Sequence, residues 1–135
     1  MHWNNKKVVV TGAGGFIGSH LTDALVRAGA KVTAVTRYNS RGDDGNLRWL
    51  DEDVRSALTI RSMELTDTDA VRQVLDGHDV VFNLAAFVGI PYSYQTPQDT
   101  ILNNLTSTLN VLLVAREGGV GRVVQTSTSE VYGTA

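Results

Sequence analysis

The stretch TGAGGFIG, residues Thr11–Gly18, decides the fold. It follows a short β-branched run at residues 6–11, which is typical of a strand buried on both faces. From Phe16 onward apolar residues recur at helical spacing as far as Ala28, and Gly29 stands where a helix would end. The pattern therefore predicts a strand, a tight turn and a helix in immediate succession.

The glycines of this turn have the spacing that dinucleotide binding requires. Gly12 permits a sharp exit from the strand, Gly15 lets the backbone approach a pyrophosphate, and Gly18 allows the helix to pack closely on the strand. The pyrophosphate would lie at the helix N-terminus, where free N–H groups and the helix dipole favour an anion. Such glycines can be purely structural, but the alternating strands and helices around them favour a dinucleotide. We expect NAD(P) to contact Gly12, Gly15, Phe16, Ile17 and Gly18.

The rest of the chain repeats the alternation of strand and helix. Further strands are predicted at residues 31–36, 57–60, 79–84 and 122–126. Helices are predicted from Thr68 to Gly77 and from Pro97 to Gly118, with a polar loop at 37–53 that contains a short helical piece at 47–50. The fold class is therefore α/β: a Rossmann-type, doubly wound parallel sheet of about five strands in the order 3-2-1-4-5.

The last predicted helix has apolar residues at helical spacing. We expect one side of it to face the core, with the residues Ile101, Leu105, Leu109, Leu112, Val114 and Ala115.

Composition limits the possible functions. The chain has 135 residues, of which 42% are apolar, so we expect a single domain over residues 1–135. A net charge of −2 disfavours nucleic acid as a partner, and the absence of cysteine excludes thiolate chemistry. His2, His20 and His78 are too scattered for a metal site. With no signal-peptide core and no apolar run near the roughly 20 residues of a membrane span, we expect a cytoplasmic location without membrane contact.

The end of the second predicted strand bears on the choice between NAD and NADP. An acidic residue there would hold the ribose hydroxyls and repel a 2′-phosphate. Residues 36–41 instead contain Arg37 and Arg41, with Ser40 between them. Guanidinium groups suit a phosphate, so the sequence favours NADP, with Arg37 and Ser40 as contacts. The alternative is that these arginines are simply solvated.

Four landmarks occur in order along the chain: TGAGGFIG at Thr11–Gly18, NLAA at Asn83–Ala86, Asn104 in the long helix, and STSEVYG at Ser127–Gly133. In this order they resemble the extended short-chain dehydrogenase/reductases, the NAD(P)-dependent nucleotide-sugar epimerase/dehydratase family. The family more often has histidine where Asn83 stands. The resemblance covers nearly the whole chain and is more specific than the glycine spacing alone.

The resemblance implies further cofactor contacts. In the family the acidic residue after the third strand recognises the adenine, and Glu64, followed by Leu65, matches that position, where aspartate is usual. The Ala-Ala segment lies along the nicotinamide half, and an asparagine of the long helix helps to organise the site. These roles fall to Leu84, Ala85, Ala86 and Asn104, for which core packing is the alternative.

The motif after the fifth strand is most like that of the family's 4,6-dehydratases. The resemblance gives Thr128 the hydroxyl that binds the sugar, and it gives Glu130 the role of the base that removes the C5 proton once C4 is oxidised. Ser129 stands where some dehydratases have aspartate, which favours the enzymes that act on UDP-N-acetylglucosamine or GDP-mannose. A 4-epimerase is the alternative, and an exposed acid without a role is the alternative for Glu130.

The family's catalytic Tyr-x-x-x-Lys pair is absent, because no tyrosine of this chain has a lysine four residues later. We therefore expect the chain to be a truncated cofactor-binding portion without the substrate domain, inactive on its own, from a parent enzyme that forms a homodimer partly through the helix near Pro97. A noncatalytic NAD(P)-binding module is the alternative from another functional class.

Overall fold

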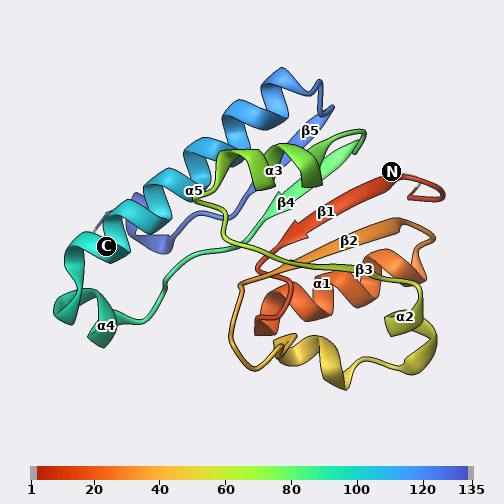
Figure 1. Cartoon of the computed structure of the whole chain (residues 1–135), viewed down its shortest axis with the longest axis horizontal. Coiled ribbons are helices and arrows are strands. Elements are labelled where there is room, and N and C mark those ends of the chain that lie inside the picture. Colours follow the sequence, from red (N-terminus) through yellow and green to blue (C-terminus); the bar gives the residue numbers. More distant parts are fainter. Residues whose placement is uncertain (1–2, 134–135) are drawn as a thin grey trace.

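The computed structural model describes residues 3–133 and contains a five-stranded parallel sheet (Figure 1). The strand order is β3-β2-β1-β4-β5, so the predicted Rossmann-type α/β topology is confirmed. The order reverses between β1 and β4, which makes the carboxyl ends of these two strands the place where a ligand is expected. The strands are β1 (Lys7–Thr11), β2 (Lys31–Thr36), β3 (Thr59–Ser62), β4 (Val80–Asn83) and β5 (Arg122–Gln125).

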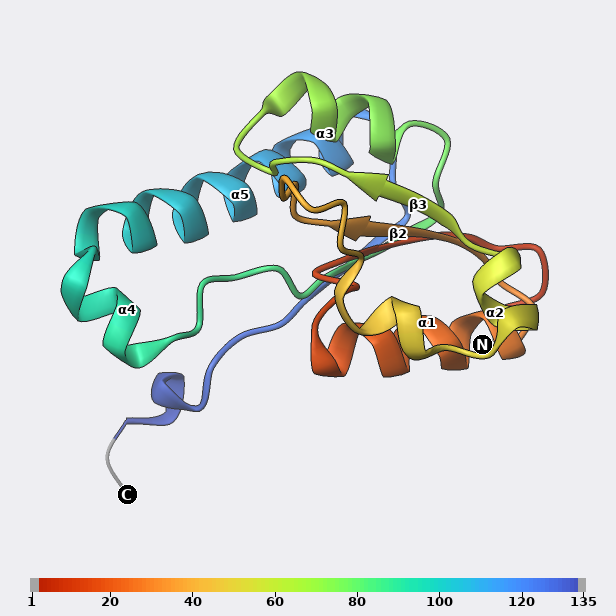
Figure 2. The same ribbon diagram turned by 60° about the horizontal axis from the view of Figure 1, so that its bottom comes forward.

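Helices cover both faces of the sheet, and the two faces are separated clearly in Figure 2. One face carries α1 (Phe16–Arg27), the 3₁₀ helix η1 (Gly45–Trp49) and α2 (Glu52–Ser56). The other face carries α3 (Thr68–Leu75) and α5 (Pro97–Glu117). The short helix α4 (Ile90–Gln95) lies beyond the carboxyl ends of the strands, and η2 (Ser129–Tyr132) follows β5.

The central strand β1 explains why the sheet needs both layers. Val8 and Val10 pack toward α1, Val9 packs toward α3 and α5, and all three are fully buried. Because successive side chains of a strand point to opposite faces, this apolar run is stable only with helices on both sides.

Short elements depart from the sequence prediction. Helix α2, which was not predicted, begins at the end of the predicted loop and continues up to the predicted strand; Val54 is buried against the core, and the C-cap is Ala57. Strand β3 therefore begins at Thr59 instead of residue 57. Helix α4 and the 3₁₀ helix η2 were not predicted, because four to six residues are too few to show helical periodicity.

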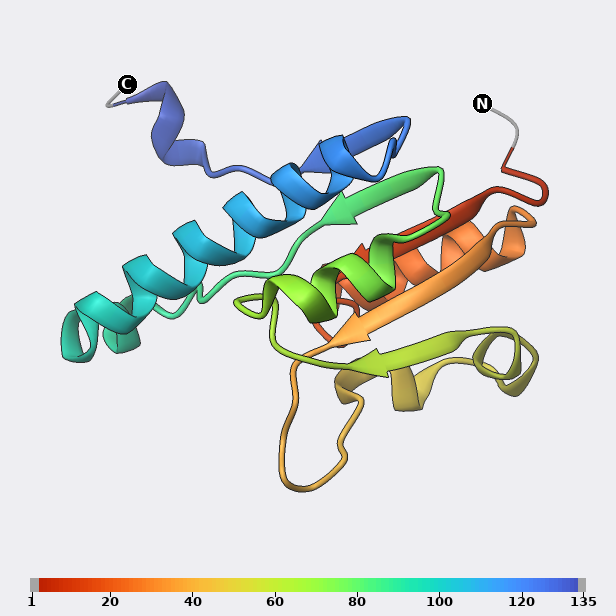
Figure 3. The same cartoon turned by 45° about the horizontal axis from the view of Figure 1, so that its top comes forward.

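The predicted inner side of α5 is wrong at four of its six positions. Ile101 and Leu105 are 64% and 65% exposed, and Leu109 and Leu112 are also largely exposed. The first half of α5 extends beyond the sheet toward α4 (Figure 3), so the sheet does not cover its apolar side chains. The buried residues are Ser107, Asn110, Val111, Val114 and Ala115, so only the last two of the six expected positions are inside.

Candidate cofactor site

A cavity of about 620 Å³ opens at the carboxyl ends of the strands, between the glycine turn, the loop after β2 and the segment after β4. Ligands of parallel α/β sheets bind at this edge. A smaller cavity of about 320 Å³ lies at the opposite edge, around Trp3, Lys6, His78 and Asp79. Only the larger cavity combines the glycine turn with the reversal in strand order, which makes it the candidate site.

The three glycines of the turn serve different purposes. Gly12 has a φ of +67°, and a Cβ there would lie 2.9 Å from the Ala85 nitrogen. A Cβ on Gly18 would overlap the carbonyl oxygen of Gly12. Gly15 has an ordinary φ of −74°, and its Cβ would lie 3.2 Å from the same oxygen. Folding therefore requires Gly12 and Gly18, whereas Gly15 mainly keeps the cavity open beside the helix N-terminus.

The N-terminus of α1 faces this cavity without a cap of its own. Among the described residues no side chain caps it, and its first turn has no acidic residue. Phe16 and Ile17, in that first turn, line the cavity and are 73% and 67% exposed. Uncapped N–H groups and the helix dipole favour an anionic group such as a pyrophosphate.

A chain of buried polar contacts fixes the strand ends that form the cavity floor. The Thr11 hydroxyl donates to Asn83 Oδ1 at 2.6 Å and accepts from the backbone nitrogens of Leu84 and Ala85 at 3.1 and 3.2 Å. Asn83 Nδ2 donates to Gln125 Oε1 at 2.8 Å. Thr11 and Asn83 are fully buried. The glycine turn, the segment after β4 and the end of β5 are thus tied together across three strands.

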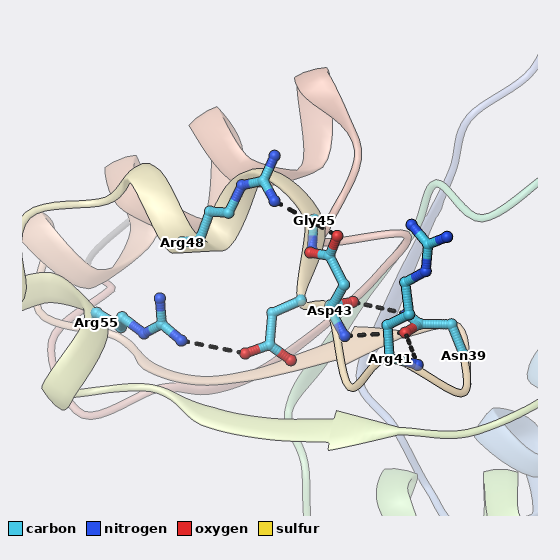
Figure 4. A network of polar contacts seen from close by, with 7 residues as sticks. Asn39, Arg41, Asp43, Gly45, Arg48 and Arg55 are labelled. Carbon is cyan, nitrogen blue, oxygen red and sulfur yellow. Dashed lines mark hydrogen bonds and ion pairs between the residues drawn. The ribbon is translucent and has the colours of Figure 1, made fainter.

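The loop after β2 is held in place by its own side chains, as Figure 4 shows. Asn39 Oδ1 accepts from the backbone nitrogens of Arg41 and Asp43, and Asn39 Nδ2 donates to the Asp43 carbonyl at 2.7 Å. Asp43 Oδ1 accepts from the Gly45 nitrogen at 2.8 Å, and its other oxygen lies 3.4 Å from Arg48 Nη1. Asn39 and Asp43 both line the cavity, although neither is among the cofactor contacts predicted from the sequence.

The Arg37 side chain connects two other parts of the cavity rim. Its Nε lies 3.4 Å from Glu64 Oε1, just after β3. Its guanidinium carbon lies 4.5 Å from the centre of the Phe87 ring, just after β4. The cationic group thus makes an exposed ion pair and a cation–π contact at once.

Neighbouring asparagines of α5 have different roles. The Asn104 side chain accepts from the Phe87 nitrogen at 2.7 Å and donates to the Phe87 oxygen at 3.1 Å, so it fixes the segment after β4. Asn103, together with Ser107 one turn later, lines the cavity itself. These two were missed because the helical phase of α5 cannot be read from its sequence alone.

The structure brings most of the predicted cofactor contacts to one cavity. Those on its wall are Gly12, Gly15, Phe16, Ile17, Gly18, Arg37, Leu65, Leu84, Ala85 and Ala86. Ser40 and Glu64 lie near its rim without lining it, and Asn104 reaches it through the Phe87 backbone.

The two predicted catalytic residues lie beyond the end of β5, at the start of η2, and do not line the cavity. Thr128 is the N-cap of η2, and its Oγ1 accepts from the Glu130 nitrogen at 3.3 Å. The Glu130 side chain is exposed. Thr126, two residues before Thr128, does line the cavity, so the segment with Thr128 and Glu130 begins at the edge of the cavity.

The cavity fits a dinucleotide on grounds of its own. The glycine turn leaves a cradle that side chains would fill, and the helix end beside it lacks an anionic partner among residues 3–133. The Thr36 hydroxyl, at the cavity wall, is buried without a hydrogen-bond partner in that part of the chain.

Within residues 3–133 no three acidic or histidine side chains gather in the way a metal ion requires; His2 lies outside this range. None of the described helices has the length and apolar character to cross a membrane.

Comparisons with known proteins agree with this fold. Residues 9–135 match the family model described as GDP-mannose 4,6 dehydratase. The UDP-N-acetyl-alpha-D-glucosaminuronate decarboxylase of Bacillus cytotoxicus is 34% identical over 128 residues, which are 95% of this chain and 38% of that protein. The UDP-glucose 4-epimerase of Mus musculus is 31% identical over 135 residues, 95% of this chain and 39% of that protein.

Solved structures are similar over nearly the whole chain. The UDP-N-acetylglucosamine 4-epimerase from Methanobrevibacter ruminantium M1, in complex with UDP-N-acetylmuramic acid, has a TM-score of 0.83 and 35% identity, over 98% of this chain and 41% of that one. The Bordetella bronchiseptica enzyme WbmH, in complex with NAD⁺, has a TM-score of 0.79 and 29% identity, over 98% and 42%. The chain thus spans about two fifths of the length of these relatives.

The family match covers almost all of the chain, and it agrees with the order of the four sequence landmarks and with the strand order. The chain therefore belongs to the GDP-mannose 4,6-dehydratase family, among the extended short-chain dehydrogenase/reductases that convert nucleotide sugars.

Proposed function

We propose that this chain is the NAD(P)-binding portion of a nucleotide-sugar 4,6-dehydratase. The observation that carries the proposal is the placement of Thr128 and Glu130 directly after β5, at the same sheet edge as the cofactor cavity. A carboxylate at this edge suits proton removal from a substrate that lies against the nicotinamide. In this proposal the substrate is a UDP-N-acetylglucosamine or GDP-mannose type of nucleotide sugar.

Each residue has a distinct role in the proposal. Bound NAD(P) supplies hydride acceptance from sugar C4 and hydride return to C6. Glu130 removes the C5 proton, which is acidic next to a C4 ketone, before water leaves across C5 and C6. The Thr128 hydroxyl accepts from the Glu130 nitrogen, so its own proton is free to donate to a sugar oxygen.

The cofactor lies along the cavity in the same proposal. The pyrophosphate binds at the N-terminus of α1, and the adenosine half extends across the ends of β2 and β3 toward Glu64. The nicotinamide half lies along Leu84–Ala86, whose backbone is fixed by Thr11. We propose NADP as the preferred cofactor because Arg37 offers a guanidinium to the 2′-phosphate, while the Asp43 carboxylate is occupied by Gly45 and Arg48.

The second candidate is a nucleotide-sugar 4-epimerase, which the similarity to the Methanobrevibacter epimerase favours. Epimerisation does not need a carboxylate at position 130, because no C5 proton is removed. The role of Glu130 therefore separates the two activities.

We also propose a homodimer that uses the first half of α5. Ile101, Leu102 and Leu105 are each more than 60% exposed, and Leu109 continues the same apolar surface. A large exposed apolar surface of this kind is typical of an interface. Sedimentation of the complete enzyme is expected to give a dimer, and a monomer would contradict this assignment.

The test of the proposed reaction uses the complete enzyme that contains this chain. Glu130→Gln is expected to abolish both dehydration and exchange of the C5 proton with deuterated solvent, while C4 oxidation is retained. Glu52→Gln, on the distant helix α2, is the matched control and is expected to behave as wild type. Unimpaired dehydration by Glu130→Gln would contradict the proposal. The 135-residue chain alone is expected to show no turnover, since it has no Tyr-x-x-x-Lys pair.

A further inference from the structure

The Arg37 side chain makes the kinds of contact that an adenine base makes. A flat, delocalised guanidinium lies 4.5 Å from the centre of the Phe87 ring, and its Nε faces Glu64 Oε1 at 3.4 Å. Adenine is likewise flat, stacks on aromatic rings and donates through its amino group to a carboxylate. Glu64 lies at the end of the cavity proposed for the adenosine half, and the Phe87 ring, from the segment after β4, meets it there through Arg37.

We propose that Arg37 is an internal competitor of the cofactor's adenine. It contacts the Glu64 carboxylate and the Phe87 ring, and it leaves both when the adenosine half binds. This inference rests on the proposed NAD(P) function, with adenine near Glu64.

The contacts are suited to exchange because only the arginine side chain has to move. The loop after β2 is fixed by Asn39 and Asp43. The Phe87 backbone is fixed by Asn104, and its ring packs edge-on against Tyr92 at 5.6 Å between centres. The Arg37 and Glu64 side chains are 64% and 41% exposed, and exposed ion pairs are weak. A bound ligand can therefore displace Arg37 without rearranging the fold.

The competition determines cofactor selectivity. Both NAD and NADP must displace Arg37, so both lose affinity to the same extent. Only NADP offers the displaced guanidinium a new partner, the 2′-phosphate, with charge-assisted and bidentate hydrogen bonds. Arg37 would thus disfavour NAD actively as well as attract NADP.

The test measures binding of NAD, NADP and AMP to wild-type chain and to Arg37→Ala by calorimetry. Loss of the competitor is expected to raise the affinity for NAD and AMP about three- to tenfold. This range corresponds to the free energy of one exposed cation–π contact and one exposed ion pair. NADP gains the same factor but also loses its phosphate partner, so its affinity relative to NAD is expected to fall about tenfold or more. Arg72→Ala, which removes the same charge from the exposed surface of α3, is the matched control and is expected to bind all three as wild type.

The sign of the change separates competition from simple attraction. If Arg37 only attracted anions, Arg37→Ala would weaken NAD and AMP along with NADP. If Arg37→Ala and a second variant, Arg37→Gln, bind NAD and AMP as tightly as wild type or more weakly, the inference is overturned. That result leaves the proposed cofactor site standing. Wild-type chain that binds neither NAD nor NADP would overturn the proposed cofactor site itself, and the inference with it.

Discussion

Helices α1 and α5 are packed on opposite faces of the same sheet, yet the chain buries them very differently. Leu25 of α1 is 4% exposed, and the helix lies flush on β1 because Gly18 brings the two backbones together. In α5 only the second half is buried, while Leu105, in the first half, is 65% exposed. Apart from Phe16 and Ile17 at the cavity, the large apolar side chains of α1 are thus buried or partly buried within residues 3–133, whereas the first half of α5 presents an apolar surface outward.

The comparison shows what positions a cofactor site in this fold. The cavity floor is fixed mainly by contacts among β1, α1 and β4, including the buried hydrogen bond between Thr11 and Asn83. The contribution of α5 comes from polar residues, since Asn110 holds the backbone before α3 and Asn104 holds Phe87. The apolar residues of its first half are therefore free to serve a different purpose.

The largest expected effect separates the two helices directly. Leu25→Ala removes a fully packed side chain from α1 and is expected to lower the free energy of unfolding by about 3 kcal/mol. Leu105→Ala makes the same chemical change on α5, and it is expected to alter the free energy of unfolding by less than about 0.5 kcal/mol. Urea denaturation of the two variants at low protein concentration, where association is absent, provides the measurement. Equal losses would contradict the comparison.

The next prediction concerns two buried threonines of the α1 side. Thr11→Val removes a hydroxyl that serves three hydrogen bonds, so it is expected to destabilise the chain by about 2 kcal/mol. Thr22→Val is the matched control, because the buried Thr22 hydroxyl has no partner among residues 3–133. That variant is expected to be neutral or stabilising by up to about 1 kcal/mol. Thermal denaturation measures both, and a stable Thr11→Val variant would refute the structural role of the polar chain.

The smallest expected effect lies at the opposite edge of the sheet. Asp79 Oδ2 accepts from the Lys7 nitrogen at 2.9 Å, and this hydrogen bond, together with the charge of Lys6, holds the pKa of the Asp79 carboxyl below its ordinary value. A lowered pKa contributes stability above the unfolded-state value of about 4, and this stability is lost as the pH falls through the folded-state value.

The matching variant is Asp79→Asn. Its melting temperature is expected to be slightly below that of wild type at pH 7, and the difference is expected to vanish near pH 2, since both proteins then carry a neutral group there. Melting curves over this pH range measure the effect. A difference that persists unchanged into acid would show that the charge of Asp79 is irrelevant.

The sequence predicts those parts of the molecule that depend on neighbours along the chain. Gly12, Gly15 and Gly18 stand in one turn between one strand and one helix, so their arrangement follows from local rules. The strand order follows from the alternation of strands and helices and from the handedness of crossovers.

What the sequence could not predict depends on contacts between distant segments. The exposure of Leu105 depends on where the sheet ends beneath α5, and the position of Asn103 and Ser107 on the cavity wall depends on the rotation of that helix. The contact of Arg37 with Phe87 joins residues 37 and 87 through the fold alone. None of these has a periodic signature.

The central claim is that the glycine turn binds the pyrophosphate of NAD(P). Gly15→Ala tests it because Gly15 has an ordinary backbone conformation and its new Cβ would lie 3.2 Å from one carbonyl oxygen. Gly118→Ala is matched to it, since a Cβ there would also lie 3.2 Å from one carbonyl oxygen, at the far end of α5.

The most direct measurement is calorimetric titration of NADP into wild-type chain and these two variants, with thermal denaturation as the check on folding. The account predicts saturable binding by wild type and Gly118→Ala, and affinity weakened about tenfold or more in a folded Gly15→Ala variant. Wild-type affinity in Gly15→Ala, or no saturable binding of either NAD or NADP by the wild-type chain, would contradict it.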